Sequence, residues 1–461
     1  MNRDLTTADR ATLLAIIAEQ EILLSQQQAT ITQLQTTTTE LQKRITVLES
    51  RLSGGGSSGM PGNKPATAQR TARKKEARKK RPHGFARVRM EPTERVAHAV
   101  DACPDCGTHL YGGWEQRTRE VIEIPVVPVR VIEHVFIARE CPVCGTRCIP
   151  TDAVLDDVVV GQQRLGINLV SLITTLREEG RMPLRTIQWY VKTVHGLHLS
   201  VGGLVAVIQG VARQGQQAVD QILKEIRGSP VVHADETGWR QEGKNGYVWT
   251  YSTPTTRYFV RRGRNKEVVD EVLGDAFEGV LVTDFYAAYD HYAGLHQRCW
   301  AHLLRDIHAL CGVYPDDAAL HGWAEAVHTL YQEAKAFAAP DERVRERKRL
   351  EREERLLQVC RPFVADPLAV QGRLCRRIHR YIRELFTFVQ YPAVPSENNA
   401  AERSLRHLVT SRKISGGTRS GEGTESKMIL SSLFGTWRAL ALNPFEQCCQ
   451  LLRSSAKSPS I

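Results

Sequence analysis

The order of apolar runs in the middle of the sequence constrains the fold of this chain more than any other feature. Three short runs rich in β-branched and aromatic residues, each bounded by turn residues, predict strands. These runs are 230–234, 247–251 and 257–260. Lys266 to Leu273 predicts a helix with Asn265 as its cap, and 279–283 predicts a fourth strand. Strands that alternate with a helix indicate an α/β region.

Two aspartates stand directly after predicted strands. Asp235 follows 231–234, and Asp284 follows 280–283. Strand, strand, strand, helix, strand is the opening order of a ribonuclease H-like fold, in which these two strands are neighbours and the carboxylates can meet. Carboxylates suit Mg²⁺, and two such ions roughly 3.5–4 Å apart can activate an attacking oxygen and stabilise a leaving one. A third carboxylate from a later helix would complete such a site. A single aspartate at a strand end is most often a cap or turn former, so the pair alone does not establish a metal site.

Two Cys-Pro-x-Cys motifs predict a structural metal site. Cys103, Cys106, Cys141 and Cys144 supply four thiolates, which suits tetrahedral Zn²⁺. Residues between the motifs alternate as in strands, which predicts a zinc ribbon: Ile122, Ile124, Val126, Val129 and Val131. Cys148 is a spare candidate ligand. A redox role is the weaker interpretation, because neither motif opens a βαβ unit.

The first 53 residues predict a coiled coil. One seam position recurs every seven residues, at Ile17, Leu24, Ile31, Thr38, Ile45 and Leu52. Leu13, Leu34, Leu41 and Leu48 fill the offset position. We therefore expect a homo-oligomer, with one amphipathic helix that lies on its own protein as the alternative.

A glycine-serine linker and a basic run follow the coil. Gly54 to Gly59 cannot hold a helix, and eight basic residues lie between Arg70 and Arg81 with only Glu76 opposing them. This run and the net charge of +11 favour a polyanionic partner, nucleic acid first; a solubilising tail is the alternative. The chain starts without an apolar signal and has no run of about 18 apolar residues, so we expect a reducing cytoplasm and no membrane.

Residues 163–227 predict helices. Four leucines are spaced for one buried face, at 165, 169, 172 and 176. Pro183 starts a second helix, residues 196–200 break it, and 201–210 resume. The pattern resembles a helix-turn-helix, with plain packing as an equal alternative. Further on, 311–390 is helical and charged, and five arginines form a stripe that either contacts phosphates or is a solvated face: Arg373, Arg376, Arg377, Arg380 and Arg383.

Several blocks resemble the insertion sequence 66 family of transposases. The blocks are 233–238 (HADETG), 284–289 (DFYAAY), 299–306 (CWAHLLRD) and 398–406 (NNAAERSLR), followed by Arg412-Lys413 and Gly416-Gly417. The coil, basic linker and paired cysteines match the family's accessory region in the same order. The resemblance implies a DDE transposase in which Asp235, Asp284 and Glu402 bind Mg²⁺ or Mn²⁺. Water would cleave DNA at the ends of an insertion sequence, and the freed 3′-hydroxyl would attack target DNA without a covalent protein intermediate.

The third acid has a rival five residues earlier. Glu402 lies one turn after Asn398 and Asn399, so the three share a helix face. Glu397 departs from the family's pattern, and we expect it to favour the helix N-terminus electrostatically instead. Cys299 and the histidine three residues later resemble an element between the last two acids, for which packing beside the site is preferred to metal ligation.

The expected architecture is a multidomain α/β protein. Its regions are a coiled coil at 1–53, a basic flexible linker at 54–98, a zinc-ribbon domain at 99–150, a helical, helix-turn-helix-like DNA-binding region at 151–228, the first part of a ribonuclease H-like catalytic core at 229–310, a helical insertion at 311–390, and the last part of the core with the third acid and C-terminal helices at 391–461. The rival functions are a DNA-binding regulator on an inactive transposase scaffold and a structure-selective nuclease. The presence of all three acids argues against the first, and the resemblance of the whole chain argues against the second.

Overall fold

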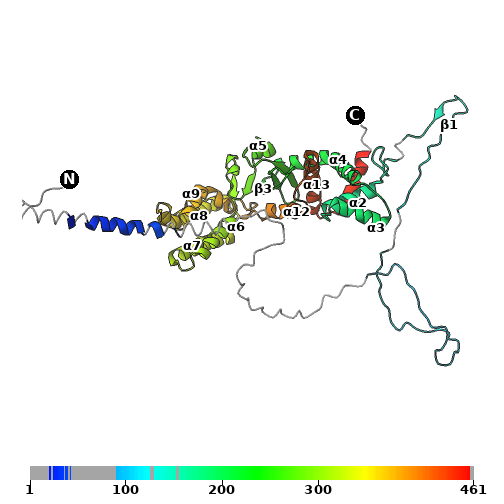
Figure 1. Ribbon diagram of the computed structural model, residues 1–461, viewed down its shortest axis with the longest axis horizontal. Coiled ribbons are helices and arrows are strands. Elements are labelled where there is room, and N and C mark those ends of the chain that lie inside the picture. Colours follow the sequence, from blue (N-terminus) through cyan, green and yellow to red (C-terminus); the bar gives the residue numbers. More distant parts are fainter. Residues whose placement is uncertain are drawn as a thin grey trace, which may run out of the picture. The chain divides into compact units, whose positions relative to one another are not determined.

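The computed structural model describes residues 20–21, 24–35, 37–39, 42, 90–124, 129–151 and 155–456 (Figure 1). The chain divides into two units, residues 1–122 and 123–461. None of the described helices is both long and apolar enough to cross a lipid bilayer.

Part of the predicted coiled coil is described in the first unit. Residues 24–35 and 37–39 are helical, and the seam residues Leu24, Ile31 and Leu34 are exposed. The helix is therefore confirmed over this stretch, and its pairing with a second helix stays a prediction. Most other seam residues, and the basic linker up to residue 89, lie outside the described residues.

The strands predicted between the cysteine pairs are wrong where the structure describes them. Ile122, Ile124, Val129 and Val131 carry no strand and are exposed, because no apolar layer covers them. Val126 lies outside the described residues. Instead, a short antiparallel pair flanks the second cysteine motif, formed by β1 (Arg139–Glu140) and β2 (Arg147–Cys148).

A five-stranded mixed sheet forms the centre of the second unit. Its strands are β3 (Val231–Gly238), β4 (Tyr247–Ser252), β5 (Arg257–Arg262), β6 (Val280–Thr283) and β7 (His296–Arg298), in the order β5-β4-β3-β6-β7. β3, β4 and β5 pair antiparallel, whereas β6 pairs parallel with β3 and β7. The four predicted strands are confirmed. β7 had no apolar pattern to predict it, because its three residues are polar although all are buried.

Helices cover both faces of this sheet. Figure 1 labels two of the covering helices, α5 (Glu267–Leu273) and α12 (Asn399–Ser415). Val232, Ala234 and Trp249 pack on one face against α5 and the end of α4 (Val201–Arg227). Val248 and Phe259 pack on the other face against α12 and α13 (Gly421–Ala439). The predicted helix at α5 is confirmed, but Lys266, not Asn265, is its N-cap residue.

The outer edge of the sheet is closed by α13. Backbone N–H groups of Arg257 and Phe259 in β5 donate hydrogen bonds to the hydroxyls of Thr436 and Ser432, both at 3.0 Å. An open edge strand would present these groups to other chains. The hydroxyl-bearing face of α13 therefore takes the place of a sixth strand.

A helical layer precedes the sheet. It comprises α2 (Ile167–Glu178), α3 (Leu184–His195) and α4, and it shares a core with α13 and α14 (Pro444–Ala456) (Figure 1). The start of α3 after Pro183 and its end at Gly196, with φ of +67°, are confirmed. The predicted leucine face is confirmed only in part, because Val170 and Ile173 are buried in the core while Leu165, Leu169 and Leu176 pack against it half-buried.

The chain between β7 and α12 forms a second helical layer. Its elements are α6 (Trp300–Val313), α7 (Ala318–Ala336), α8 (Glu342–Val364), α9 (Gly372–Arg380), α10 (Ile382–Leu385) and α11 (Thr387–Gln390), with a 3₁₀ turn η3 (Ala287–His291) before β7. These helices have their own core around Trp300, Leu330 and Phe386. α8 is less solvated than its mixed charges predicted, because Arg352 and Glu353 are buried.

Candidate active site

The first candidate acid lies inside a strand. Asp235 belongs to β3, which continues to Gly238 because β4 pairs with it that far, so the prediction that β3 ends at Ala234 is wrong. The parallel pairing of β3 with β6 stops at His233 opposite Val282. Continuing this register by two residues sets Asp235 opposite Asp284.

The second candidate acid directly follows β6, as predicted. Asp284 accepts a hydrogen bond on Oδ1 from the Tyr286 backbone N–H at 2.9 Å. Its own carbonyl accepts from the fully buried Arg298 at 2.9 Å. Arg298 also pairs with Asp290 at 2.6 Å and with Glu384, so a buried cation fixes the backbone behind the acid. Sequence reasoning missed Arg298, because a lone arginine in a polar run carries no signal of burial.

Asn398 connects the helix of the third candidate acid to β3. Its side chain is fully buried, and its Nδ2 donates to the Ala234 carbonyl at 2.7 Å. Its Oδ1 therefore faces Nδ1 of His233 at 3.0 Å and accepts from it. Burial lowers the pKa of His233, in agreement with a neutral ring that donates from Nδ1. Asn398 thus joins the start of α12 to the residue that precedes Asp235.

Glu402 occupies the first turn of α12, four residues after Asn398. Its Oε1 is buried and has no hydrogen-bond partner among the described residues. The nearest basic groups are the imidazole Nε2 of His302 at 3.6 Å and the guanidinium of Arg305 at 3.9 Å. An unsatisfied buried carboxylate oxygen is costly unless another group binds it.

The first candidate acid is affected by the charges of the other two. The pKa of Asp235 is raised to about 8, first by burial and then by the charges of Glu236, Asp284 and Glu402. Carboxylates that raise a neighbouring carboxylate's pKa disfavour a shared negative charge, and hard oxygen ligands of this kind, one of them unsatisfied, suit a divalent cation in their chemistry. Among the described residues, no three histidine, cysteine or carboxylate side chains are already arranged to hold an ion.

Glu236 is a fourth carboxylate that sequence reasoning left without a role. It accepts hydrogen bonds from Tyr289 Oη at 2.8 Å and from Arg264 at 2.9 Å. The Arg264 guanidinium lies 4.1 Å from the centre of the Tyr286 ring. Alternation along β3 turns Glu236 to the opposite face from Asp235, and its oxygens already have donors. In the sequence, only its position directly after Asp235 could have indicated that Glu236 lies near the candidate site.

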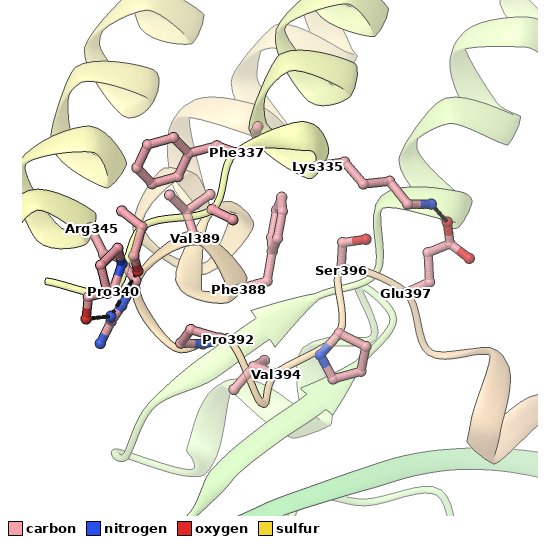
Figure 2. Close-up of a pocket in the computed structure, with 14 residues that line it drawn as sticks. Lys335, Phe337, Pro340, Arg345, Phe388, Val389, Pro392, Val394, Ser396 and Glu397 are labelled. Carbon is pink, nitrogen blue, oxygen red and sulfur yellow. Dashed lines mark hydrogen bonds and ion pairs between the residues drawn. The ribbon is translucent and has the colours of Figure 1, made fainter. Parts of the chain in front are cut away.

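The rival Glu397 lies before the first residue of α12. It accepts a hydrogen bond from Tyr331 Oη at 2.9 Å. It also pairs with Lys335 at 3.2 Å (Figure 2). These bonds outweigh the effect of burial, so the pKa of Glu397 is lowered. Glu397 lies at the start of α12 as predicted, but its oxygens bind the side chains of α7 and of Asn399, so its electrostatic effect on the helix N-terminus stays a prediction. Glu397 and Lys335 stand at the edge of a cavity of about 590 Å³ lined by Phe337, Phe388 and prolines (Figure 2).

Cys299 is a packing residue, as preferred from the sequence. It is buried, its backbone N–H donates to the Thr283 carbonyl at 2.8 Å, and its Sγ accepts from the Asn398 backbone N–H at 3.1 Å. It therefore joins the end of β6 to the start of α12. His302, one turn further along α6, faces Glu402 instead.

The arginine stripe is partly paired. Arg377 forms an ion pair with Asp306 at 2.6 Å, and Arg380 pairs with Asp290 at 2.7 Å. Arg373 is exposed. Internal pairing thus accounts for part of the stripe and leaves the choice between a phosphate contact and a solvated face open.

The two cysteine motifs form the same local loop. Residues 103–108 and 141–146 both read C-P-x-C-G-T, and in each the first cysteine N–H donates to the threonine carbonyl, at 2.8 and 2.9 Å. The two glycines have φ of +71° and +74°, which favours glycine. The adjacent threonine hydroxyls lower the pKa of Cys106 and Cys144, which favours the thiolates that Zn²⁺ requires.

Comparisons with known proteins extend this picture. A family model described as the transposase IS66 family matches residues 162–426, more than half of the chain. A model described as the zinc-finger binding domain of transposase IS66 matches residues 101–145, which include both cysteine pairs. These matches imply transposition, DNA as the partner and a zinc-binding domain.

Two proteins of Sinorhizobium fredii (strain NBRC 101917 / NGR234) are similar to this chain, and both are described as uncharacterized. The protein y4jD is 23% identical over 399 residues, which cover 79% of this chain and 75% of y4jD. The protein y4jO is 38% identical over 71 residues, which cover 15% of this chain and 22% of y4jO. With the family model covering both predicted aspartates and Glu402, the chain belongs to the IS66 family of transposases.

Proposed function

We propose that this chain is a DDE transposase with a ribonuclease H-like core that cleaves DNA and joins it to a target. The observation that carries the proposal is the β3–β6 register, which continues to Asp235 opposite Asp284, together with the Asn398 hydrogen bond that ties the start of the Glu402 helix to β3. The raised pKa of Asp235, to which burial and the charges of Glu236, Asp284 and Glu402 contribute, supports it. The order β5-β4-β3-β6-β7 supports the ribonuclease H-like assignment.

Asp235, Asp284 and Glu402 would hold Mg²⁺ or Mn²⁺. Such ions would activate the attacking oxygen and stabilise the leaving oxygen of an in-line displacement. The chain contributes position: Asn398 holds the helix of Glu402 on β3, and Arg298 holds the loop of Asp284. Water and then the freed 3′-hydroxyl attack phosphodiesters in turn, so the protein forms no covalent intermediate.

A cleavage assay with duplexes that carry the ends of the element tests this proposal. In Mg²⁺, Asp235→Asn, Asp284→Asn and Glu402→Gln should each lose cleavage by roughly 100-fold or more while they still bind DNA. Glu278→Gln, at an exposed carboxylate just before β6, is the matched control and should cleave normally. Normal cleavage by any of the three variants would remove that residue from the site. Cleavage without joining to target DNA would favour the nuclease instead.

The four cysteines of the two Cys-Pro-x-Cys motifs would bind one structural Zn²⁺. The equal loops at 103–108 and 141–146 and the match to a zinc-finger model support this assignment. Metal analysis should find about one zinc per chain, and Cys103→Ser should lose it. Cys148→Ser, at a cysteine outside both Cys-Pro-x-Cys motifs, should keep its zinc. A folded wild-type chain without zinc would contradict the assignment.

The N-terminal helix would join copies of the chain. Its exposed seam residues Leu24, Ile31 and Leu34 support a coiled coil, because such side chains are normally buried against a partner. Light scattering should find a smaller oligomer for Leu24→Asn/Ile31→Asn, whereas Gln28→Asn should leave the mass unchanged. An equal mass for all three proteins would contradict the coil.

A further inference from the structure

Helix α3 lies on the outside of the helical layer that precedes the sheet. Of its twelve residues, only Ile187 and Val191 are buried. The turn into α4 is fixed by Gln188, whose Nε2 donates to the Leu199 carbonyl at 2.7 Å. Most of this helix is therefore held rigidly and left uncovered.

The uncovered side carries one stripe of large side chains. Arg185, Trp189 and Lys192 are exposed, with 61% of Trp189 accessible to solvent. Trp189 and Lys192 follow Arg185 by four and seven residues, so the three side chains share one face of the helix. Over seven residues the stripe is roughly 10 Å long, close to the width of a DNA major groove of about 12 Å. We call this stripe the α3 face.

The α3 face is positive, and no carboxylate among the described residues pairs with its cations. The sequence of α3 contains no carboxylate, and neither Arg185 nor Lys192 is paired with another residue that the structure describes. The two acids at the end of α2 point elsewhere: Glu178 pairs with the buried Lys427 at 2.7 Å, and Glu179 pairs with Arg438. The local charge therefore remains available to an anionic partner.

We propose that the α3 face docks into duplex DNA, with Arg185 and Lys192 on phosphates or base edges and Trp189 between them. This inference rests on the proposed function and names the element that engages the substrate. A second copy of the chain fits the face poorly, because a symmetric pair would set cations against cations. An aromatic side chain flanked by two cations suits a nucleic-acid surface, where charge and apolar base edges alternate.

The proposed DNA contact of α3 also changes which helices would form the predicted helix-turn-helix. The sequence placed its second helix at 201–210, but α4 continues to Arg227 and buries Leu204, Val207, Val211 and residues beyond them against α2 and α13. Eight residues of α4 are buried along its length, whereas only two residues of α3 are. α3 follows α2 after a short turn and is the exposed member of the layer.

Fluorescence anisotropy with the full chain and a duplex of arbitrary sequence tests the proposal over a series of salt concentrations. R185Q/K192Q should bind more weakly and lower the slope of log affinity against log salt by about two, since each phosphate contact contributes about 0.9. Trp189→Ala should weaken binding without a change in slope. The matched control is Arg343→Gln/Arg347→Gln on α8, an exposed pair that alternates with glutamates, and it should bind like the wild type.

Three outcomes would overturn the inference. Unchanged affinity and slope in R185Q/K192Q, when the wild type binds DNA, would remove the α3 face from the contact. A lower mass of Trp189→Ala in light scattering would assign the face to a second copy. A wild type that binds no duplex would remove the proposed function itself, and this inference with it. Circular dichroism should match for all variants, because the substituted side chains are exposed.

Discussion

Replacement of Asn398 by alanine should separate the third acid from the first. The side chain makes two fully buried hydrogen bonds, to the Ala234 carbonyl at 2.7 Å and with His233 at 3.0 Å. The substitution leaves both partners unsatisfied, and each such buried group costs about 1–3 kcal/mol. We therefore expect the free energy of unfolding to fall by roughly 2–6 kcal/mol.

The effect on activity should exceed the effect on folding. Without its tether the start of α12 can move, and a misplacement of about 1 Å in a catalytic group can cost on the order of 100-fold in rate. The assays are urea unfolding and Mg²⁺-dependent cleavage at a temperature where both proteins are folded. We expect Asn398→Ala to be folded but nearly inactive under these conditions.

The adjacent Asn399 supplies the matched control. Its side chain binds only Glu397, in a half-buried position, so Asn399→Ala should cost no more than about 1.5 kcal/mol and retain most cleavage. If Asn398→Ala and Asn399→Ala were equally stable and equally active, the tether between α12 and β3 would have no functional role.

Three further predictions follow from charges in the second unit. Glu402→Gln should eliminate cleavage, whereas Glu397→Gln should cost on the order of 1 kcal/mol in stability; the reverse pattern would exchange their roles. Lys427→Met should lower the free energy of unfolding by about 3–5 kcal/mol, because it leaves Glu178 buried and unpaired, and a second substitution, Glu178→Leu, should restore most of the loss. Asp235 has a folded pKa of about 8 against an ordinary 3.8, so the folded chain holds this proton more tightly than the unfolded chain, and stability without metal should fall as pH rises from about 4 to 8, by at most about 6 kcal/mol. Asp235→Asn should flatten that fall in melting experiments with a chelator, and parallel curves for both proteins would contradict it.

The elements with strong local patterns could be predicted from the sequence, and the elements fixed by distant contacts could not. The four strands and the break at Gly196 follow from apolar runs and one glycine, so they were accessible. β7 consists of three buried polar residues, and one of them, Arg298, pairs with two acidic residues. The local sequence does not indicate these pairings.

The candidate acids were predictable because each stands at a recognisable place, after a strand or in an asparagine-rich helix start. What supports them was not predictable. The side-chain partners of Glu397, Tyr331 and Lys335, were not predicted because they lie more than 60 residues away in the sequence. The continuation of β3 through Asp235 depends on pairing with β4, which the strand's own composition does not reveal.

Metal rescue tests the central claim most directly, because it separates a metal ligand from a residue that only supports the fold. Thiolate is a soft ligand that suits Mg²⁺ poorly and Mn²⁺ better. We predict that Asp235→Cys and Glu402→Cys are inactive in Mg²⁺ and regain DNA cleavage in Mn²⁺, whereas Glu236→Cys, at the carboxylate on the opposite face of β3, shows no such dependence on the metal. Cleavage by the wild type in the presence of a chelator, or equal activity of Asp235→Cys in both metals, would contradict the claim that these carboxylates act through bound ions.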